Sequence, residues 1–171
     1  LLNVADSNNL ETASQTLRNT FSGAAADSSV GSWSITEKSS LENQIWAANT
    51  QVNFCAKAYP TVPSGHPDAP ALSVLAAYLR NGYLHRCIRE QGGAYGGGAS
   101  HDGNIGAFRF FSYRDPRNLE TLNDFDASLD WILTSEHDAS ALEEAILSVI
   151  SSVDKPASPA GEVKKAFYDG L

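Results

Sequence analysis

Hydrophobic side chains recur every three or four residues in several stretches of the chain, and this spacing predicts helices. Near the start, Leu10, Ala13, Leu17 and Phe21 share one helical face, which predicts a surface helix. A longer helix is expected after Asp68. Its apolar residues form two stripes, so we expect a central helix that is covered on more than one side. One stripe contains Leu72, Leu75, Ala76, Leu79, Tyr83 and Cys87, and the other contains Val74, Tyr78 and Ile88.

Three further helices are predicted in the C-terminal part of the chain. Asp115 and Pro116 are typical of a helix start, and apolar residues follow on one face up to position 133. Ser140 and Glu143 have the S-x-x-E spacing of a capping box, which predicts that the next helix begins there. A Ser-Pro pair at 158–159 predicts the start of a last helix.

Alternation of apolar and polar residues predicts strands in the middle of the chain. Residues 52–59 alternate in this way, and so does the aromatic run 105–113. The glycine-rich residues 94–100 are expected to pair with that run, with a turn at 101–104. At most one short strand is expected near residues 33–35. The order of these elements predicts an α+β fold in which an antiparallel sheet carries helices mainly on one face.

Composition favours one soluble domain. With 171 residues, 42% hydrophobic and 19% charged, the chain can form one packed core, and we expect residues 1–171 to be a single domain. No run of about 20 apolar residues is present, which predicts no membrane span. The sequence begins with leucine and contains no methionine, so we expect a fragment of a larger protein. Cys55 and Cys87 lack metal-ligand spacing and are expected to be buried or half-buried free thiols.

The charge of the chain is unevenly distributed. The net charge of −8 argues against a nucleic-acid-binding surface, because binding to phosphates requires a basic field. Six of the seven arginines nevertheless lie between positions 80 and 117, together with only three acidic residues. That segment is therefore +3 and the rest of the chain −11. The glycine-rich stretch lies inside this cationic segment.

Several familiar catalytic patterns are absent from the sequence. The four histidines form neither H-E-x-x-H nor the inverted H-x-x-E-H, so we expect no complete catalytic zinc site in this chain. Ser100, His101 and Asp102 supply the residue types of a hydrolase triad, but consecutive residues cannot adopt its geometry, and we expect a polar hairpin turn there. The glycines match neither G-x-G-x-x-G nor a P-loop, which argues against nucleotide binding.

The stretch IREQGGAYGGGASHDG, residues 88–103, has two explanations. It can be a flexible helix terminator followed by a weakened edge strand. It can also be a peptide-binding groove, because glycines leave a strand without side-chain walls and another backbone can then approach closely. In that case Arg89 and Tyr95 would donate hydrogen bonds to the carbonyls of a bound extended peptide. The residues alone leave both explanations open.

The longer stretch LHRCIREQGGAYGGGASHDGNIGAFRFFSYRDPRNLETL, residues 84–122, resembles the C-terminal half of the pitrilysin/insulinase family of zinc metallopeptidases. It is most similar to the presequence-protease-like branch, in which I-R-x-x-G-G-A-Y-G-x-G-A precedes a strand that ends in F-x-S-Y-R-D-P. NTQVNFCAKAYP (49–60) and VDKPASPAGEVKKAF (153–167) are also similar to that branch. The resemblance covers most of residues 45–170.

This resemblance implies a large clamshell peptidase of related α+β domains, of which the chain would be the C-terminal part. Two halves would enclose a chamber for unfolded peptides, and the N-terminal half, outside this chain, would bind the zinc cofactor. By motif position, Arg89 would hold a substrate carbonyl and Tyr95 would stabilise the tetrahedral intermediate. The glycines expected beside the substrate are Gly92, Gly93, Gly96 and Gly97. The expected partners are peptide substrates and the N-terminal half, and the isolated chain is expected to be inactive.

Other roles stay open under the same resemblance. The fold also serves in non-catalytic subunits that bind peptides or hold complexes together, and an intact or degraded H-x-x-E-H upstream would distinguish the two classes. The presence of the arginine and the tyrosine of the motif favours the enzyme over the non-catalytic subunit. A stand-alone peptide-binding module would need a natural start near Leu1. Family members occur in bacteria and organelles, so the expected compartment is a soluble bacterial, mitochondrial or chloroplast one.

Overall fold

The computed structural model describes residues 2–23 and 41–169, and the short strand expected near 33–35 lies outside these ranges. The chain divides into two compact units. The first unit contains α1 (Leu10–Thr20) and α5 (Pro159–Asp169), which confirms the helices predicted near the two ends of the sequence. Neither these helices nor the others described have the length and apolar character needed to cross a membrane.

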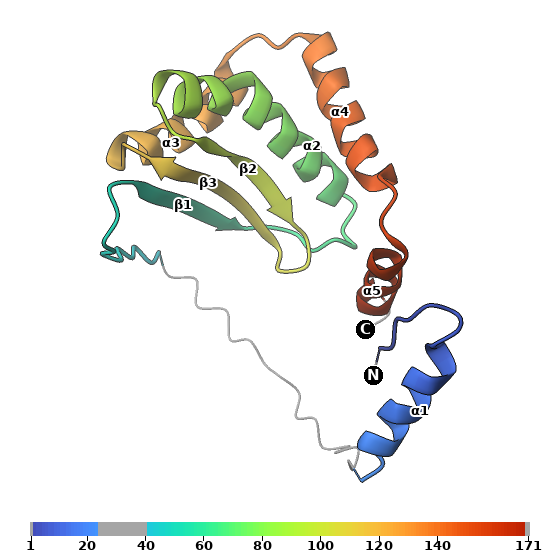
Figure 1. The fold of residues 1–171 in the computed structure, drawn as a ribbon. Coiled ribbons are helices and arrows are strands. Elements are labelled where there is room, and N and C mark those ends of the chain that lie inside the picture. Colours follow the sequence, from blue (N-terminus) through green and yellow to red (C-terminus); the bar gives the residue numbers. More distant parts are fainter. Residues whose placement is uncertain (1, 24–40, 170–171) are drawn as a thin grey trace. The chain divides into compact units, whose positions relative to one another are not determined.

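The second unit, Ala47–Lys155, holds the sheet and four helical segments (Figure 1). In chain order its elements are β1 (Asn53–Pro60), α2 (Ala69–Leu79), the π-helix η1 (Arg80–Gln91), β2 (Gly96–Asp102), β3 (Ala107–Asp115), α3 (Leu119–Thr134) and α4 (Ala139–Asp154). The three strands are antiparallel in the order β1-β3-β2, so β3 is central and the glycine-rich β2 is at an edge. The predicted β2–β3 hairpin and the α+β class are confirmed.

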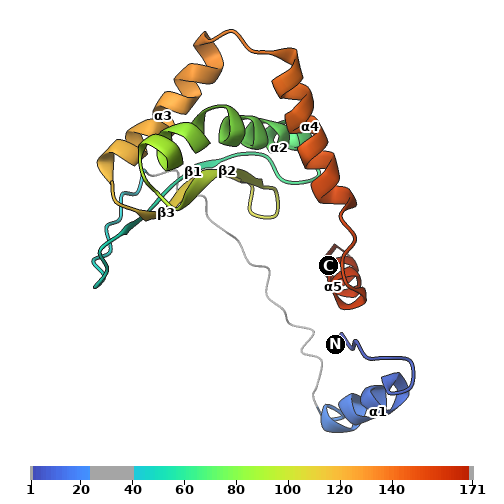
Figure 2. The same cartoon turned by 45° about the horizontal axis from the view of Figure 1, so that its top comes forward.

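Helices cover one face of this sheet, as predicted, with α2 and α3 on the same side (Figure 2). Burial along the central strand β3 fits this arrangement, because its side chains alternate between the two faces of the sheet. Phe108 and Phe110 are buried against the helices, whereas Phe111 and Tyr113 point to the opposite face and are more than a third exposed. On that opposite face β1 adds Phe54, which is 66% exposed. The sheet therefore presents a partly aromatic open face.

The predicted central helix is present, but its second half is a π-helix. From Arg80 to Gln91 the backbone has π-helical hydrogen bonding, in which each turn holds more residues than in an α-helix. Leu79 and Leu84, five positions apart, are both fully buried, whereas Tyr83, which an α-helical stripe would bury, is only half-buried. Because each π-helical turn holds more residues, the buried side chain after Leu79 lies one position later in the sequence than an α-helix would place it.

The core has two parts, which confirms that the central helix is covered on more than one side. Leu79, Leu84 and Ile88 pack with Phe110 and Phe125 in the main cluster between helices and sheet. A second cluster, on the side of α4, consists of Ala77, Tyr78 and Ala145 with Trp131 packed against it.

Two predicted helix starts are wrong, each for a local reason. Asp115 is the last residue of β3, and α3 begins only at Leu119. The N-cap of α4 is Asp138, whose carboxylate accepts a hydrogen bond from the amide of Ser140 at 3.0 Å. Ser140 is therefore already inside the helix, and the predicted capping box does not form there.

Candidate functional site

The candidate site begins where η1 ends. Arg89 lies on the last turn and is exposed, and Gly92 is the C-cap. Gly93 has φ +78°, the left-handed conformation predicted for a helix terminator. The amides of Gly93 and Ala94 donate to the carbonyls of Arg89 and Ile88, both at 3.1 Å. These bonds fix the direction in which the chain leaves the helix.

Tyr95 follows this terminator directly and is 63% exposed. Its ring lies 5.3 Å from that of Tyr113, centre to centre. The guanidinium carbon of Arg114 lies 5.7 Å from the same ring, in a cation–π arrangement. Arg114 has φ +50°, which a residue with a side chain adopts only at a cost. The phenol of Tyr95 is thus held from two sides while it remains open to solvent.

The glycines of the site are tightly packed. A Cβ on Gly92 would collide with the guanidinium of Arg117, and one on Gly96 with the ring of Tyr113. A Cβ on Gly97 would lie 2.8 Å from the side chain of Ile88 and 2.9 Å from the carbonyl oxygen of Phe111. The close approach that these glycines allow is therefore to side chains and backbone of the same chain. Their contact with a peptide stays a prediction.

Arg89 has polar neighbours on its own helix. Its Nη1 lies 3.4 Å from Nε2 of His85, one turn earlier. The other ring nitrogen of His85, Nδ1, lies 3.3 Å from a carboxylate oxygen of Glu90. All three side chains are exposed. The guanidinium of Arg89 consequently keeps donors available for a ligand.

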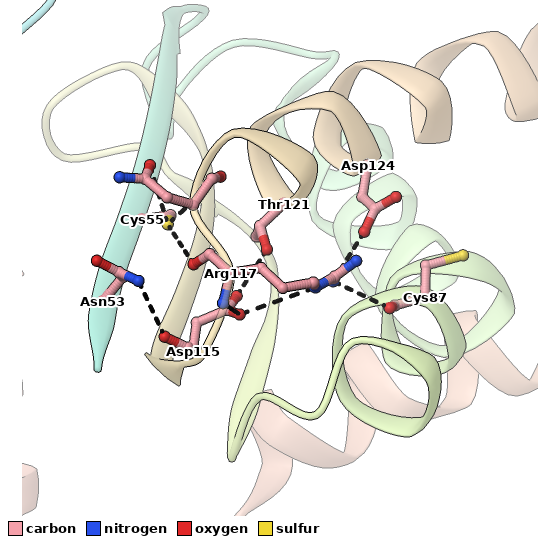
Figure 3. A network of polar contacts seen from close by, with 8 residues as sticks. Asn53, Cys55, Cys87, Asp115, Arg117, Thr121 and Asp124 are labelled. Atoms are coloured by element: carbon pink, nitrogen blue, oxygen red, sulfur yellow. Dashed lines mark hydrogen bonds and ion pairs between the residues drawn. The ribbon is translucent and has the colours of Figure 1, made fainter. Parts of the chain in front are cut away.

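A network of polar contacts lies beneath this loop, and the sequence did not reveal it (Figure 3). Asp115 is completely buried, and its carboxylate accepts from the amide of Arg117 at 2.9 Å and from the hydroxyl of Thr121 at 2.8 Å. Nη2 of Arg117 donates to the carbonyl of Cys87 at 3.1 Å and to the carboxylate of Asp124 at 2.9 Å. The network joins the end of η1 to the start of α3.

The pattern that could have indicated part of this network is the hairpin register. Once β2 pairs with β3, Gly96 lies opposite Tyr113. The residues that follow Tyr113 must then lie beside those that precede Gly96, because the two strands are antiparallel. The contact between Arg117 and Cys87 has no such local pattern, since the two residues are 30 positions apart.

The open face of the sheet also has a shallow hollow of about 400 Å³. Its lining comes from all three strands and includes Ala56, Ala58, Ser100, Arg109 and Phe111. Arg109 forms an ion pair with Asp102 at 3.2 Å.

Ser100, His101 and Asp102 lie in β2, so the polar turn expected at these residues is wrong. The turn lies beyond them, and Nε2 of His101 lies 3.0 Å from the carbonyl of Val62, to which it donates. Cys55 and Cys87 are free and buried, as predicted.

The described residues do not fit a zinc ion. Within residues 2–23 and 41–169 no three His, Cys, Asp or Glu side chains come together as possible metal ligands. The histidines are engaged elsewhere: His137, for example, contacts the hydroxyl of Tyr78 at 3.1 Å and the carbonyl of Ile132 at 2.9 Å.

Known proteins are similar in sequence to this chain over most of its length. Residues 43–169 match the family model described as the PreP C-terminal domain. The chain is 46% identical over 119 residues to the mitochondrial presequence protease of Kluyveromyces lactis. It is 43% identical over 122 residues to the proteins of that name from Xenopus laevis and Saccharomyces cerevisiae. These alignments cover 69%, 70% and 71% of the chain, respectively, and 12% of each relative.

The fold and the match together define an α+β domain of the pitrilysin/insulinase type. More specifically, the chain belongs to the PreP C-terminal domain family. It spans 12% of the length of the curated relatives that it matches.

Proposed function

We propose that the chain is the C-terminal domain of a zinc metalloendopeptidase that degrades unfolded peptides in an enclosed chamber. The observation that supports this proposal is the placement of Arg89 and Tyr95. They are exposed hydrogen-bond donors six residues apart, on either side of a hydrogen-bonded helix terminator, in a family whose relatives are named presequence proteases.

Each of the two side chains has a distinct role in this proposal. Arg89 binds a carbonyl of the substrate backbone through its guanidinium, which offers several N–H donors in a fixed fork. The hydroxyl of Tyr95 donates to the oxygen of the scissile carbonyl as that carbon becomes tetrahedral and the oxygen gains negative charge. A donor of this kind contributes about 3–4 kcal/mol to the stability of the transition state in enzymes where it has been removed. Gly92, Gly93, Gly96 and Gly97 lie beside the bound peptide.

The remaining parts of the site lie outside residues 1–171 in this proposal. Because no described residues fit zinc, the metal is bound by the N-terminal half of the same polypeptide, which is also the partner that closes the chamber. The isolated chain is then inactive. The relatives are named as mitochondrial proteins, and we place the whole protein in the mitochondrion by analogy.

Peptide hydrolysis by the full-length protein tests the two roles. Tyr95→Phe is expected to lower kcat by a factor of about 10²–10³, because only the hydroxyl is lost and KM depends little on it. Arg89→Ala is expected to raise KM and to lower kcat. Arg86→Ala, which removes an exposed arginine one turn earlier on η1, is the matched control and should leave both constants close to wild type.

Two outcomes would contradict the proposal. Wild-type turnover in both Tyr95→Phe and Arg89→Ala would exclude the assigned roles. Peptide binding without any cleavage by the wild-type full-length protein would instead support a non-catalytic peptide-binding or structural subunit.

A further inference from the structure

We propose that residues 113–117, here called the positioning segment, hold Arg89 and Tyr95 in their working positions, and that Arg117 is the main positioning residue. This inference rests on the proposed function, because it assigns a task to residues that support the candidate site. The segment has the sequence Tyr-Arg-Asp-Pro-Arg and consists of the last three residues of β3 and the first two of the connection to α3.

Four members of the positioning segment contact the candidate site directly. The ring of Tyr113 lies against that of Tyr95, and it also occupies the place where residue 96 would carry a Cβ. The carbonyl of Arg114 accepts from the amide of Tyr95 at 3.3 Å. The ring of Pro116 lies beside Gly93, 3.5 Å from the position of a Cβ there. The guanidinium of Arg117 occupies the place where Gly92 would carry one.

Asp115, the fifth member, holds the segment itself together. Its buried carboxylate binds the amide of Arg117 through one oxygen and the hydroxyl of Thr121 through the other. A buried carboxylate with two such hydrogen bonds stabilises one backbone conformation, because any other would leave the charge unpaired. The direction of the Arg117 side chain is therefore fixed at its base.

The guanidinium of Arg117, at the far end of the side chain, links the candidate site to α3. A single nitrogen, Nη2, donates both to the carbonyl of Cys87 and to the carboxylate of Asp124 (Figure 3). Cys87 lies two residues before Arg89, so the bond fixes the turn of η1 that carries Arg89. Because the same guanidinium lies against Gly92, it also fixes the start of the loop that carries Tyr95.

Arg117 is a positioning residue and not a ligand of the substrate. Its side chain is 26% exposed, and its Nη2 donates to Cys87 and Asp124, whereas Arg89 and Tyr95 are exposed. Arg117 must therefore affect catalysis through the positions of Arg89 and Tyr95. Geometric errors of about 1 Å at a reacting centre can lower the rate of a reaction by a factor of about 10².

Arg117→Lys in the full-length protein is the central test. Lysine keeps the charge, but its compact ammonium on a flexible stem does not reproduce the planar guanidinium between Cys87 and Asp124. We expect kcat to fall by a factor of about 10–100 while KM changes less than about twofold. Asp124→Asn, a milder change that leaves Arg117 in place, is expected to lower kcat less. Arg86→Lys is the matched control, since Arg86 is exposed on the same helix.

Two further readouts separate positioning from general stability. Hydrogen exchange of residues 88–96 should be faster in Arg117→Lys and unchanged in Arg86→Lys, because the amides of Gly93 and Ala94 are bonded at this terminator. In a protein that already carries Arg89→Ala and Tyr95→Phe, adding Arg117→Lys should not lower kcat further.

The inference is overturned if exchange of residues 88–96 is the same in Arg117→Lys and Arg86→Lys, or if Arg117→Lys lowers kcat equally in both backgrounds. It is also overturned if Arg117→Lys speeds this exchange while kcat stays at the wild-type value. Failure of the proposed function is seen separately, as wild-type turnover in the Arg89 and Tyr95 variants.

Discussion

The backbone amide of Tyr95 donates to the carbonyl of Arg114 at 3.3 Å, and the Arg114 guanidinium lies over the ring of the same tyrosine. Both contacts are made by Arg114, whose backbone is left-handed, with φ +50°. Strained residues of this kind occur where the surrounding structure determines the conformation, often at functional sites. Here the strain lies in the residue that faces the proposed catalytic phenol.

Substitution of Arg114 tests whether the left-handed conformation is required. Arg114→Gly adopts a positive φ without steric cost, whereas Arg114→Val carries a β-branched side chain that opposes it. We expect the valine variant to have a free energy of unfolding at least about 1 kcal/mol below that of the glycine variant. Urea unfolding of the two proteins measures the difference. Equal stability would show that the backbone at this position relaxes freely.

Alanine at Gly97 tests whether the glycines are needed for internal packing. A Cβ there meets the side chain of Ile88 and the carbonyl oxygen of Phe111, and the backbone cannot move without disturbing the β2–β3 pairing. We expect Gly97→Ala to lower the free energy of unfolding by about 1–3 kcal/mol. Gly65→Ala is the control, because no atom lies within 4 Å of its Cβ position, and a change within about 0.5 kcal/mol is expected. Similar effects at the two positions would argue against tight packing of β2.

The pH dependence of stability tests the environment of Cys55. Burial raises the pKa of this thiol above its ordinary value of 9.0. The folded protein therefore holds the proton more tightly than the unfolded chain. This contribution to stability is fully present below pH 9.0 and is lost as the pH rises through the folded pKa.

Cys55→Ser removes this titration and should give a shallower decline of the unfolding free energy above pH 9.0 than the wild-type protein. Chemical denaturation at a series of pH values measures both slopes. Parallel slopes would mean that the thiol is not protected from ionisation in the fold.

Metal analysis tests where zinc is bound. Since the described residues bring no three candidate ligands together, the chain of 171 residues should retain well below one zinc ion after equilibrium dialysis. The full-length protein should retain a stoichiometric amount. Tight binding of one zinc ion by the shorter chain would contradict the assignment of the ligands to the N-terminal half.

Periodicity predicted the class of the fold and most of its elements, because alternation and helical spacing are local properties. Residues 52–59 were expected as a strand and form most of β1. The same spacing failed at Leu84, since the stripe assumed an α-helix and the backbone is π-helical from Arg80. The Asp-Pro pair and the capping-box pattern placed helix starts at Asp115 and Ser140. In the structure the carboxylate of Asp115 accepts from the amide of Arg117, and the amide of Ser140 donates to Asp138.

For the candidate site, local sequence indicated the exposed residues and missed those that hold them. Tyr95 stands out because it lies among glycines, and Arg89 because it lies a few residues upstream of them. Gly93 has the left-handed conformation that a helix terminator favours. Arg117 and Asp124 were not indicated, since their contacts with the end of η1 arise only from tertiary packing. Buried polar networks of this kind depend on distances that no periodic pattern encodes.

The helical placement of Arg89 on η1 also constrains how this family can vary. An α-helix turns by about 100° for each residue, and a π-helix, with more residues in each turn, turns by somewhat less, so deletion of one residue before Arg89 would still turn its side chain far around the axis. A homologue with the same arginine but a helix one residue shorter would therefore point it elsewhere. Insertions and deletions between Arg80 and Gln91 should consequently be as rare among active relatives as replacements of the arginine itself.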